Sequence, residues 1–359
     1  MGRKVRIGLI GAGFIGQVGH LQNFVQLDEC EVVAVADLRP ELVRSVAARF
    51  NIPRAYCSHQ ELLQDRDIDA VVVVTHRSLT AEIVRDCLLA GKHVLSEKPM
   101  ASTSEQANML LEIARRNGLV YFVGFMKRHD LGVIAAKEAI QTAISNQSLG
   151  RLTFVRIHCF AGDSYCKIDG AVSTTEPRIS FAPTLPIAPE WLDAGLHTAY
   201  SIYLNTYSHD IDLIRFFTNE TPEIEYSDTL NEDCQLAVLG FPGFKCVLET
   251  GRSSNRGWDE SAEFHFENGR ISIQFPPPFL RNVPASFEVY EAGSKQTVTR
   301  PLIEWSWAFK RQACAFLDLV IAGRANCESA KEAAINVEIA ENLWRSSIER
   351  FNQSRTRRS

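Results

Sequence analysis

Apolar and polar residues follow two different patterns along this chain. In the first third, short continuous runs of apolar, mostly β-branched residues alternate with stretches of helical periodicity. Continuous apolar runs are typical of parallel strands that helices cover on both faces. Strands are expected in residues 5–10, 31–37, 69–75, 93–99 and 119–125, with a shorter one near 55–56. Helices are expected from Gly16 to about Leu27, from Pro40, near 61–63, and over 79–90 and 104–116. This alternation predicts a doubly wound parallel α/β sheet over residues 1–125.

The pattern changes after Gly124. A helix is expected over residues 131–144 and a strand over 152–159, and four prolines then make residues 163–195 irregular. A segment of this length is a surface loop, the wall of a pocket or an arm in an oligomer.

Further along, the chain alternates in the manner of strands packed on one face. These runs are residues 235–241, 245–250, 261–266, 270–275 and 287–290, with helices expected over 200–217, 305–322 and 330–351. Residues 126–359 are therefore expected to form a second α/β domain. Its sheet is expected to be large, open and mostly antiparallel.

Composition narrows the function classes. A chain of 359 residues is long enough for two domains, and its net charge of -5 argues against a nucleic-acid partner. Nine cysteines without any Cys-x-x-Cys pair predict reduced thiols and no metal site. No apolar run approaches the ~18 residues of a membrane span, and the first residues lack the apolar core of a signal peptide. A cytoplasmic protein without a membrane partner is expected.

A glycine motif joins the first expected strand to the first helix. Gly11 and Gly13 would permit a tight turn and the close approach of a pyrophosphate, and Gly16 would let the helix pack on the strand. Asp37 ends the next strand, at about the 20-residue spacing of the acid that binds the ribose hydroxyls. The motif predicts a Rossmann domain that binds NAD. Arg39 could accommodate a 2′-phosphate, so NADP stays possible. A plain tight βα turn is the structural alternative.

A charged sequence ends the strand expected over residues 93–99, namely Glu97-Lys98-Pro99. A lysine at the carboxyl end of a buried strand is costly without a task, and ligands of open α/β sheets bind just beyond these ends. Lys98 is therefore expected where a cofactor meets a substrate. An ion pair with Glu97 is the alternative.

In residues 91–99 and in its glycine motif, the chain resembles the Gfo/Idh/MocA family, which includes glucose–fructose oxidoreductase and inositol dehydrogenase. The resemblance implies that Lys98 contacts the reacting substrate hydroxyl and that the Lys98–Pro99 bond is cis. The cofactor-binding residues that it implies are Gly11, Gly13, Phe14, Ile15, Gly16, Asp37, Arg39, Thr75, His76, Glu97 and Lys98. Relatives commonly have a proline where this chain has His76, near the nicotinamide ribose.

A polar strip lies on the helix expected over residues 200–217. At 100° per residue, Asn205, His209 and Asp212 fall within ~60° of one another. The family pattern there is Asp-x-x-x-His-x-x-Asp, which implies that His209 is the general acid/base. Asn205 replaces the first aspartate, so that charge is missing. A lone buried histidine with a structural role is the alternative.

The resemblance also implies substrate contacts. These are expected at Arg128, Asn205, Asp210 and Asp212. Arg128 belongs to a sequence similar to the family's Gly-Phe-Asn-x-Arg, with Met126 in place of the asparagine, and a surface ion pair is its alternative role.

The resemblance implies an NAD(P)-dependent dehydrogenase that acts on a secondary hydroxyl of a sugar, cyclitol or glycoside. His209 would take the hydroxyl proton and Lys98 would stabilise the alkoxide. Two alternatives within the family are an NAD-dependent glycoside hydrolase and a non-catalytic, cofactor-bound regulator. The resemblance further implies that residues 126–359 serve substrate binding and oligomerisation. Relatives pair their open sheets between subunits, so a homodimer or homotetramer is expected.

Overall fold

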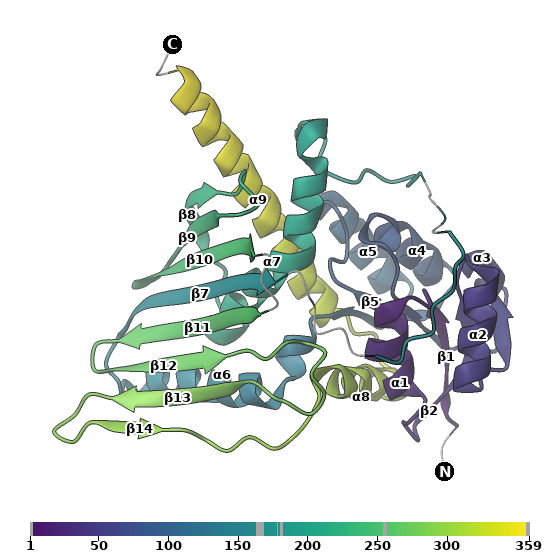
Figure 1. Cartoon of the computed structure of the whole chain (residues 1–359), viewed down its shortest axis with the longest axis horizontal. Helices are drawn as coiled ribbons and strands as arrows, with labels where there is room; N and C mark the ends of the chain where they lie inside the picture. Colours follow the sequence, from purple (N-terminus) through teal and green to yellow (C-terminus); the bar gives the residue numbers. More distant parts are fainter. Residues whose placement is uncertain (1–2, 163–168, 178, 180–181, 254–256, 357–359) are drawn as a thin grey trace. The chain divides into compact units, whose positions relative to one another are not determined.

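The structure is a computed structural model that describes residues 3–162, 169–177, 179, 182–253 and 257–356 (Figure 1). The chain divides into two compact units. Unit 1 comprises Met1–Phe125, Ile168–Asn205 and Phe309–Glu338, and unit 2 comprises Met126–Lys167, Thr206–Ala308 and Ile339–Ser359. The first crossing falls at Phe125, and two later segments return to unit 1. No sequence pattern indicated that return.

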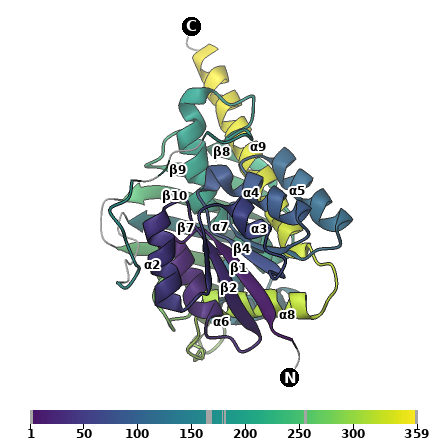
Figure 2. The ribbon, with the colours of Figure 1, turned by 90° about the vertical axis from the view of Figure 1, so that its right-hand side faces the viewer.

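Unit 1 contains a six-stranded parallel sheet in the order β3-β2-β1-β4-β5-β6. This is the strand order of a Rossmann fold. The strands are β1 (Val5–Ile10), β2 (Cys30–Ala36), β3 (Arg54–Tyr56), β4 (Ala70–Val73), β5 (His93–Glu97) and β6 (Tyr121–Gly124). Figure 2 shows β2, β1 and β4 side by side with α2 (Pro40–Phe50) along them. The predicted doubly wound parallel sheet is confirmed.

Helices cover both faces of this sheet, which explains why its strands are apolar throughout. One core cluster joins the sheet to α2 and α8 (Ala308–Ile321). The other joins it to α3 (His59–Leu63), α4 (Arg77–Leu89), α5 (Ser104–Arg116) and the start of α9 (Glu328–Thr356). The helix after the glycine motif differs from the expectation. Residues 14–15 are already helical, Gly16–Leu21 form a π-helix, and α1 (Gln22–Phe24) continues it and ends before Leu27.

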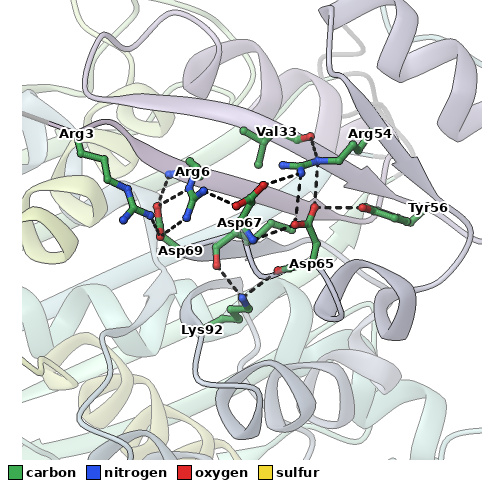
Figure 3. A network of polar contacts seen from close by, with 10 residues as sticks. Arg3, Arg6, Val33, Arg54, Tyr56, Asp65, Asp67, Asp69 and Lys92 are labelled. Carbon is green, nitrogen blue, oxygen red and sulfur yellow. Dashed lines mark hydrogen bonds and ion pairs between the residues drawn. The ribbon is translucent and has the colours of Figure 1, made fainter.

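An ion network ties the α3–β4 loop of unit 1 to the strands beside it (Figure 3). Asp69 accepts hydrogen bonds from the Arg6 backbone N–H at 2.9 Å and from the Arg3 guanidinium at 2.7 Å. The Lys92 ammonium is buried and donates to the carbonyl oxygens of Ile68 at 2.7 Å and Asp65 at 3.2 Å. A buried charge is tolerable only when it is satisfied in this way. The network therefore holds the loop that leads into β4.

Unit 2 contains an eight-stranded sheet in the order β14-β13-β12-β11-β7-β10-β9-β8. Only the β7–β10 pair is parallel, so the predicted mostly antiparallel sheet is confirmed. The strands are β7 (Leu152–Gly162), β8 (Glu223–Asp228), β9 (Gln235–Phe241), β10 (Phe244–Ser253), β11 (Trp258–Phe266), β12 (Gly269–Gln274), β13 (Ser286–Glu291) and β14 (Thr297–Thr299). No sequence prediction covered β8 or β14.

One face of this second sheet is covered by helices. α6 (Leu131–Asn146) contacts β12 and β13, and Phe217 of α7 (His197–Thr218) packs edge-on against Phe264 of β11 at 5.3 Å between ring centroids. The predicted start of α8 at residue 305 is wrong. Residues 305–307 belong to no helix or strand; there Trp307 is buried at 7 % exposure, while Trp305 is 84 % exposed. Among the described residues, no helix is both long and apolar enough to cross a membrane.

Candidate active site

Unit 1 has a cavity at the carboxyl ends of β1, β2 and β4. Its volume is about 650 Å³. Of the predicted cofactor-binding residues, those in its wall are Gly11, Gly13, Phe14, Asp37, Arg39, Thr75 and His76. Ile15, Gly16, Glu97 and Lys98 are outside this lining. The cavity lies where ligands of open α/β sheets bind.

The glycine motif is required by backbone packing. Gly11 has φ +100°, and a Cβ there would meet the Val74 carbonyl oxygen at 2.0 Å. A Cβ at Gly16 would meet the Gly11 carbonyl oxygen at 2.0 Å. At Gly13 a Cβ would meet nothing within 4 Å, so its backbone borders open space in the cavity. Gly11 and Gly16 thus serve the turn itself, and Gly13 leaves room for a group that approaches the backbone closely.

Asp37 is the acidic end of the cavity. Its carboxylate accepts a hydrogen bond from the Ala12 backbone N–H at 2.9 Å. Arg39 donates to both of its oxygens, from Nε at 2.9 Å and from NH2 at 3.1 Å. This hydrogen bond to Asp37 raises the pKa of Arg39. The two residues that the sequence offered as competing ribose determinants therefore form one bidentate ion pair.

The loop after β4 completes the cavity wall. His76 caps α4, with its Nδ1 accepting from the Ser78 backbone N–H at 3.4 Å. The Thr75 hydroxyl oxygen is buried and has no hydrogen-bond partner among the described residues. A buried polar atom without a partner is costly, so Thr75 suits a ligand that bonds to it. This hydroxyl, the open backbone at Gly13 and the carboxylate of Asp37 fit a dinucleotide.

Glu97 and Lys98 end β5 in different environments. The Glu97 carboxylate pairs with the ring of His20 at 2.8 Å and accepts from the Lys98 backbone N–H at 3.3 Å. His20 is buried and also packs edge-on against Phe309, with 5.8 Å between ring centroids. Sequence reasoning missed His20, since nothing in the chain pattern says which strand end its helix faces. The Lys98–Pro99 bond is cis, as expected.

The Lys98 ammonium reaches α7 within unit 1, at Asn205. It donates to the backbone carbonyl of Asn205 and lies 3.4 Å from its side-chain Oδ1. Asn205, where the family pattern has aspartate, is thus a neighbour of Lys98. The sequence had paired it only with His209, one helical turn further along α7.

The polar strip of α7 continues in unit 2. Arg128 forms a bidentate ion pair with Asp212, at 2.8 Å from Nε and 2.7 Å from NH2. The Arg128 guanidinium also lies over the Phe216 ring at 5.1 Å from its centroid. His209 and Asp212 are buried. Their roles in substrate binding and catalysis stay predictions.

Asp210 faces a buried cluster in unit 2. Its carboxylate, the Cys159 thiol and the Glu260 carboxylate lie within 4.8 Å of one another. Glu260 pairs with the Lys127 ammonium and accepts from Trp258 Nε1 at 3.1 Å. Burial raises the pKa of Asp210 to about 7, although the charges of Lys127 and His158 oppose this shift. The cluster thus contains its own cation, Lys127, and Asp210 binds its proton far more tightly than an exposed aspartate does.

Comparisons with known proteins show which family the chain belongs to. Residues 5–125 match the Gfo/Idh/MocA oxidoreductase family, whose members have an NAD-binding Rossmann fold. Inositol 2-dehydrogenase 2 of Paenarthrobacter aurescens is 32% identical over 356 residues, which cover 93% of each chain. Inositol 2-dehydrogenase of Acidothermus cellulolyticus is 35% identical over 293 residues, which cover 78% of this chain and 76% of that protein. This chain belongs to the Gfo/Idh/MocA family.

Two solved structures of oxidoreductases have the same fold as this chain. A 3-ketoreductase from Actinomadura kijaniata, crystallised with NADP and TDP-benzene, has a TM-score of 0.76 at 19% identity, covering 96% of this chain and 98% of its own. A putative myo-inositol dehydrogenase from Sinorhizobium meliloti has a TM-score of 0.71 at 21% identity, covering 97% and 98%. With its family established, the chain is an NAD(P)-dependent oxidoreductase, as the sequence predicted.

A first prediction concerns Asn205. Asn205→Asp would place a negative charge beside the Lys98 ammonium and raise the pKa of Lys98. Only the neutral amine is acylated, so labelling of Lys98 at pH 9 should slow roughly tenfold for each pKa unit gained. Peptide-level mass spectrometry measures this rate, with Lys331 as internal reference. Asn205→Ala, which adds no charge, should not slow it, and an unchanged rate in Asn205→Asp would contradict the contact.

A second prediction concerns the proton on Asp210. Because its pKa is raised in the folded state, the stabilisation is complete below the ordinary aspartate range and is lost as pH rises to about 7. Asp210→Asn cannot titrate, so its free energy of unfolding should depend less on pH between 4 and 7, by a few kcal/mol at most. Urea unfolding at several pH values measures this slope. Asp228→Asn, at an exposed position of β8, is the control and should keep the wild-type slope.

Proposed function

We propose that this protein oxidises a secondary hydroxyl group of a sugar, cyclitol or glycoside, reversibly, by hydride transfer to NAD(P). The observation that carries the proposal is Lys98 at the carboxyl end of β5, with its ammonium hydrogen-bonded to Asn205 of α7, the helix that also bears His209. The curated relatives reported above are named inositol 2-dehydrogenases, which supports a polyhydroxylated substrate.

Two side chains act on the reacting hydroxyl group in this proposal. His209, as general base, takes the proton of the reacting hydroxyl. Lys98 donates a hydrogen bond to the oxygen on which negative charge develops. The nicotinamide, when bound, accepts the hydride.

Arg128 and the remaining polar residues of α7 have separate roles in this proposal. Asn205 orients the Lys98 ammonium and contacts the substrate. Arg128 and Asp212 hold each other in a bidentate pair, which fixes the polar strip toward the substrate. Asp210 was predicted to contact substrate, but it is fully buried beside Lys127, and we propose a structural role for it instead.

One experiment separates this function from the alternatives. The purified protein is incubated with NAD or NADP and a panel of inositols, free sugars and glycosides. Formation of the reduced cofactor supports the dehydrogenase. Cleavage of a glycoside without net reduction indicates the hydrolase, and neither result, despite cofactor binding, indicates a regulator.

The catalytic pair generates a third prediction. Lys98→Ala and His209→Ala should each lower the rate of hydride transfer by about 10²–10⁴, the usual contribution of general acid–base catalysis. Dinucleotide affinity should persist, because neither residue lines the cavity. Single-turnover kinetics measures the rate and fluorescence titration the affinity. Lys98→Arg keeps the charge and should lose less than Lys98→Ala. Turnover of His209→Ala at the wild-type rate would contradict the assignment.

The cofactor preference is a fourth prediction. We propose NAD over NADP, because Asp37 would accept hydrogen bonds from the ribose hydroxyls and repel a 2′-phosphate. The ratio kcat/KM for the two cofactors, measured with one substrate, should favour NAD by at least about tenfold, the effect of roughly 1.4 kcal/mol. A preference for NADP would contradict it.

We also propose a homodimer or homotetramer formed through the outer face of the second sheet. This face includes half-exposed apolar side chains, among them Phe154 of β7 and Leu236 of β9. An open sheet that exposes apolar groups gains from a partner that covers them.

A further inference from the structure

The start of α2 in unit 1 is capped by a residue from a distant part of the chain. Residues 169–177 run along unit 1, where the side-chain amide of Gln17 holds Val172 through both of its backbone groups, at 2.7 Å and 3.0 Å. Four residues later, Glu176 accepts hydrogen bonds from the backbone N–H groups of Glu41 at 2.9 Å and Leu42 at 2.8 Å. These hydrogen bonds hold the Glu176 carboxylate at the start of α2.

This place is an anion site that the protein fills itself. α2 has eleven residues, its N-cap Arg39 makes no side-chain cap, and Pro40 has no N–H to donate. The first N–H groups of the helix that can donate are those of Glu41 and Leu42, and they form the positive end of the helix dipole. Burial opposes the ionisation of Glu176, but these hydrogen bonds, the Thr174 hydroxyl and the charge of Arg39 outweigh it and lower its pKa. A carboxylate therefore occupies a site suited to a phosphate.

The site borders the ribose end of the cofactor cavity. Asp37 and Arg39 both line that cavity, and Arg39 begins α2. In Rossmann enzymes the acid at this position meets the ribose hydroxyls, and a nearby arginine accommodates the 2′-phosphate of NADP. In this chain Arg39 is held by Asp37, and the adjacent helix donors are held by Glu176. Arg39 and the donors at the start of α2, two positive groups that could bind a 2′-phosphate, therefore each already have a carboxylate.

We propose that Glu176 is a second determinant of cofactor specificity, acting with Asp37 against a 2′-phosphorylated dinucleotide. The proposal rests on the NAD preference proposed above. It adds a residue outside the Rossmann sequence motif. Replacement of Asp37 alone would leave the Glu176 charge in place, so that change is not sufficient to admit NADP.

Binding of nucleotide fragments to the full-length protein tests the proposal. The probes are 2′,5′-ADP, which carries the 2′-phosphate, and 5′-ADP, which does not. In Glu176→Gln, calorimetry should show 2′,5′-ADP binding roughly five- to tenfold tighter, the effect of removing one partly screened like charge. The affinity for 5′-ADP should change by less than about twofold, because the glutamine amide oxygen still accepts from α2. Asp37→Ser with Glu176→Gln should bind 2′,5′-ADP tighter than Asp37→Ser alone.

Glu82→Gln is the matched control. Glu82 also accepts a hydrogen bond from this part of the chain, from the Thr184 backbone N–H at 3.0 Å, but it lies on α4. It should leave both affinities unchanged. If Glu176→Gln changes both fragments equally, or if Glu82→Gln has the same effect, Glu176 is only an anchor and the proposal is wrong. Glu176→Ser, a shorter neutral acceptor, gives the same comparison if the glutamine variant does not fold. Fragment binding requires no turnover, so this binding result can be interpreted even if the proposed reaction is wrong.

Discussion

The close approach of two backbone segments governs the cofactor side of this molecule. The turn after β1 packs against the end of β4, with Gly11 placed so that any side chain would collide with the Val74 carbonyl. The same turn supplies the Ala12 N–H to Asp37, which in turn orients Arg39. The cavity therefore derives its shape from backbone atoms, and its charge from the Asp37 carboxylate, which Ala12 and Arg39 hold in place.

Buried charges are satisfied locally in both units, and this limits which residues are available for chemistry. In unit 1, Lys92 is satisfied by backbone carbonyls and Glu97 by His20. In unit 2, Lys127 is satisfied by Glu260, and burial raises the pKa of Asp210 to about 7. Such pairs keep the folded state from burying an uncompensated charge, which would cost several kcal/mol or more. Lys98 differs from these residues in position, because it follows the end of β5 and donates to the backbone carbonyl of Asn205 on α7, whose side-chain Oδ1 lies 3.4 Å away.

Local signals were sufficient for most of the first domain. Runs of β-branched residues, helix caps and the glycine spacing are short-range features, and each depends on residues within about a helical turn of one another. β8 and β14, which no prediction named, are the two edge strands of the second sheet. The start of α8 was misplaced because Trp305 is apolar but exposed.

By itself, the sequence determined the Rossmann sheet, the antiparallel second sheet, the glycine turn with Asp37, and the strand end that bears Lys98. Each of these follows from periodicity or from a fixed spacing along the chain. Only the tertiary structure decided which distant groups meet: Asn205 with Lys98, His20 with Glu97, Asp210 with the Lys127–Glu260 pair, and Glu176 with the start of α2. The reason is that charge satisfaction in a folded chain depends on distances in space. More than a hundred residues separate Glu176 from the helix that it caps, and no local pattern records that distance.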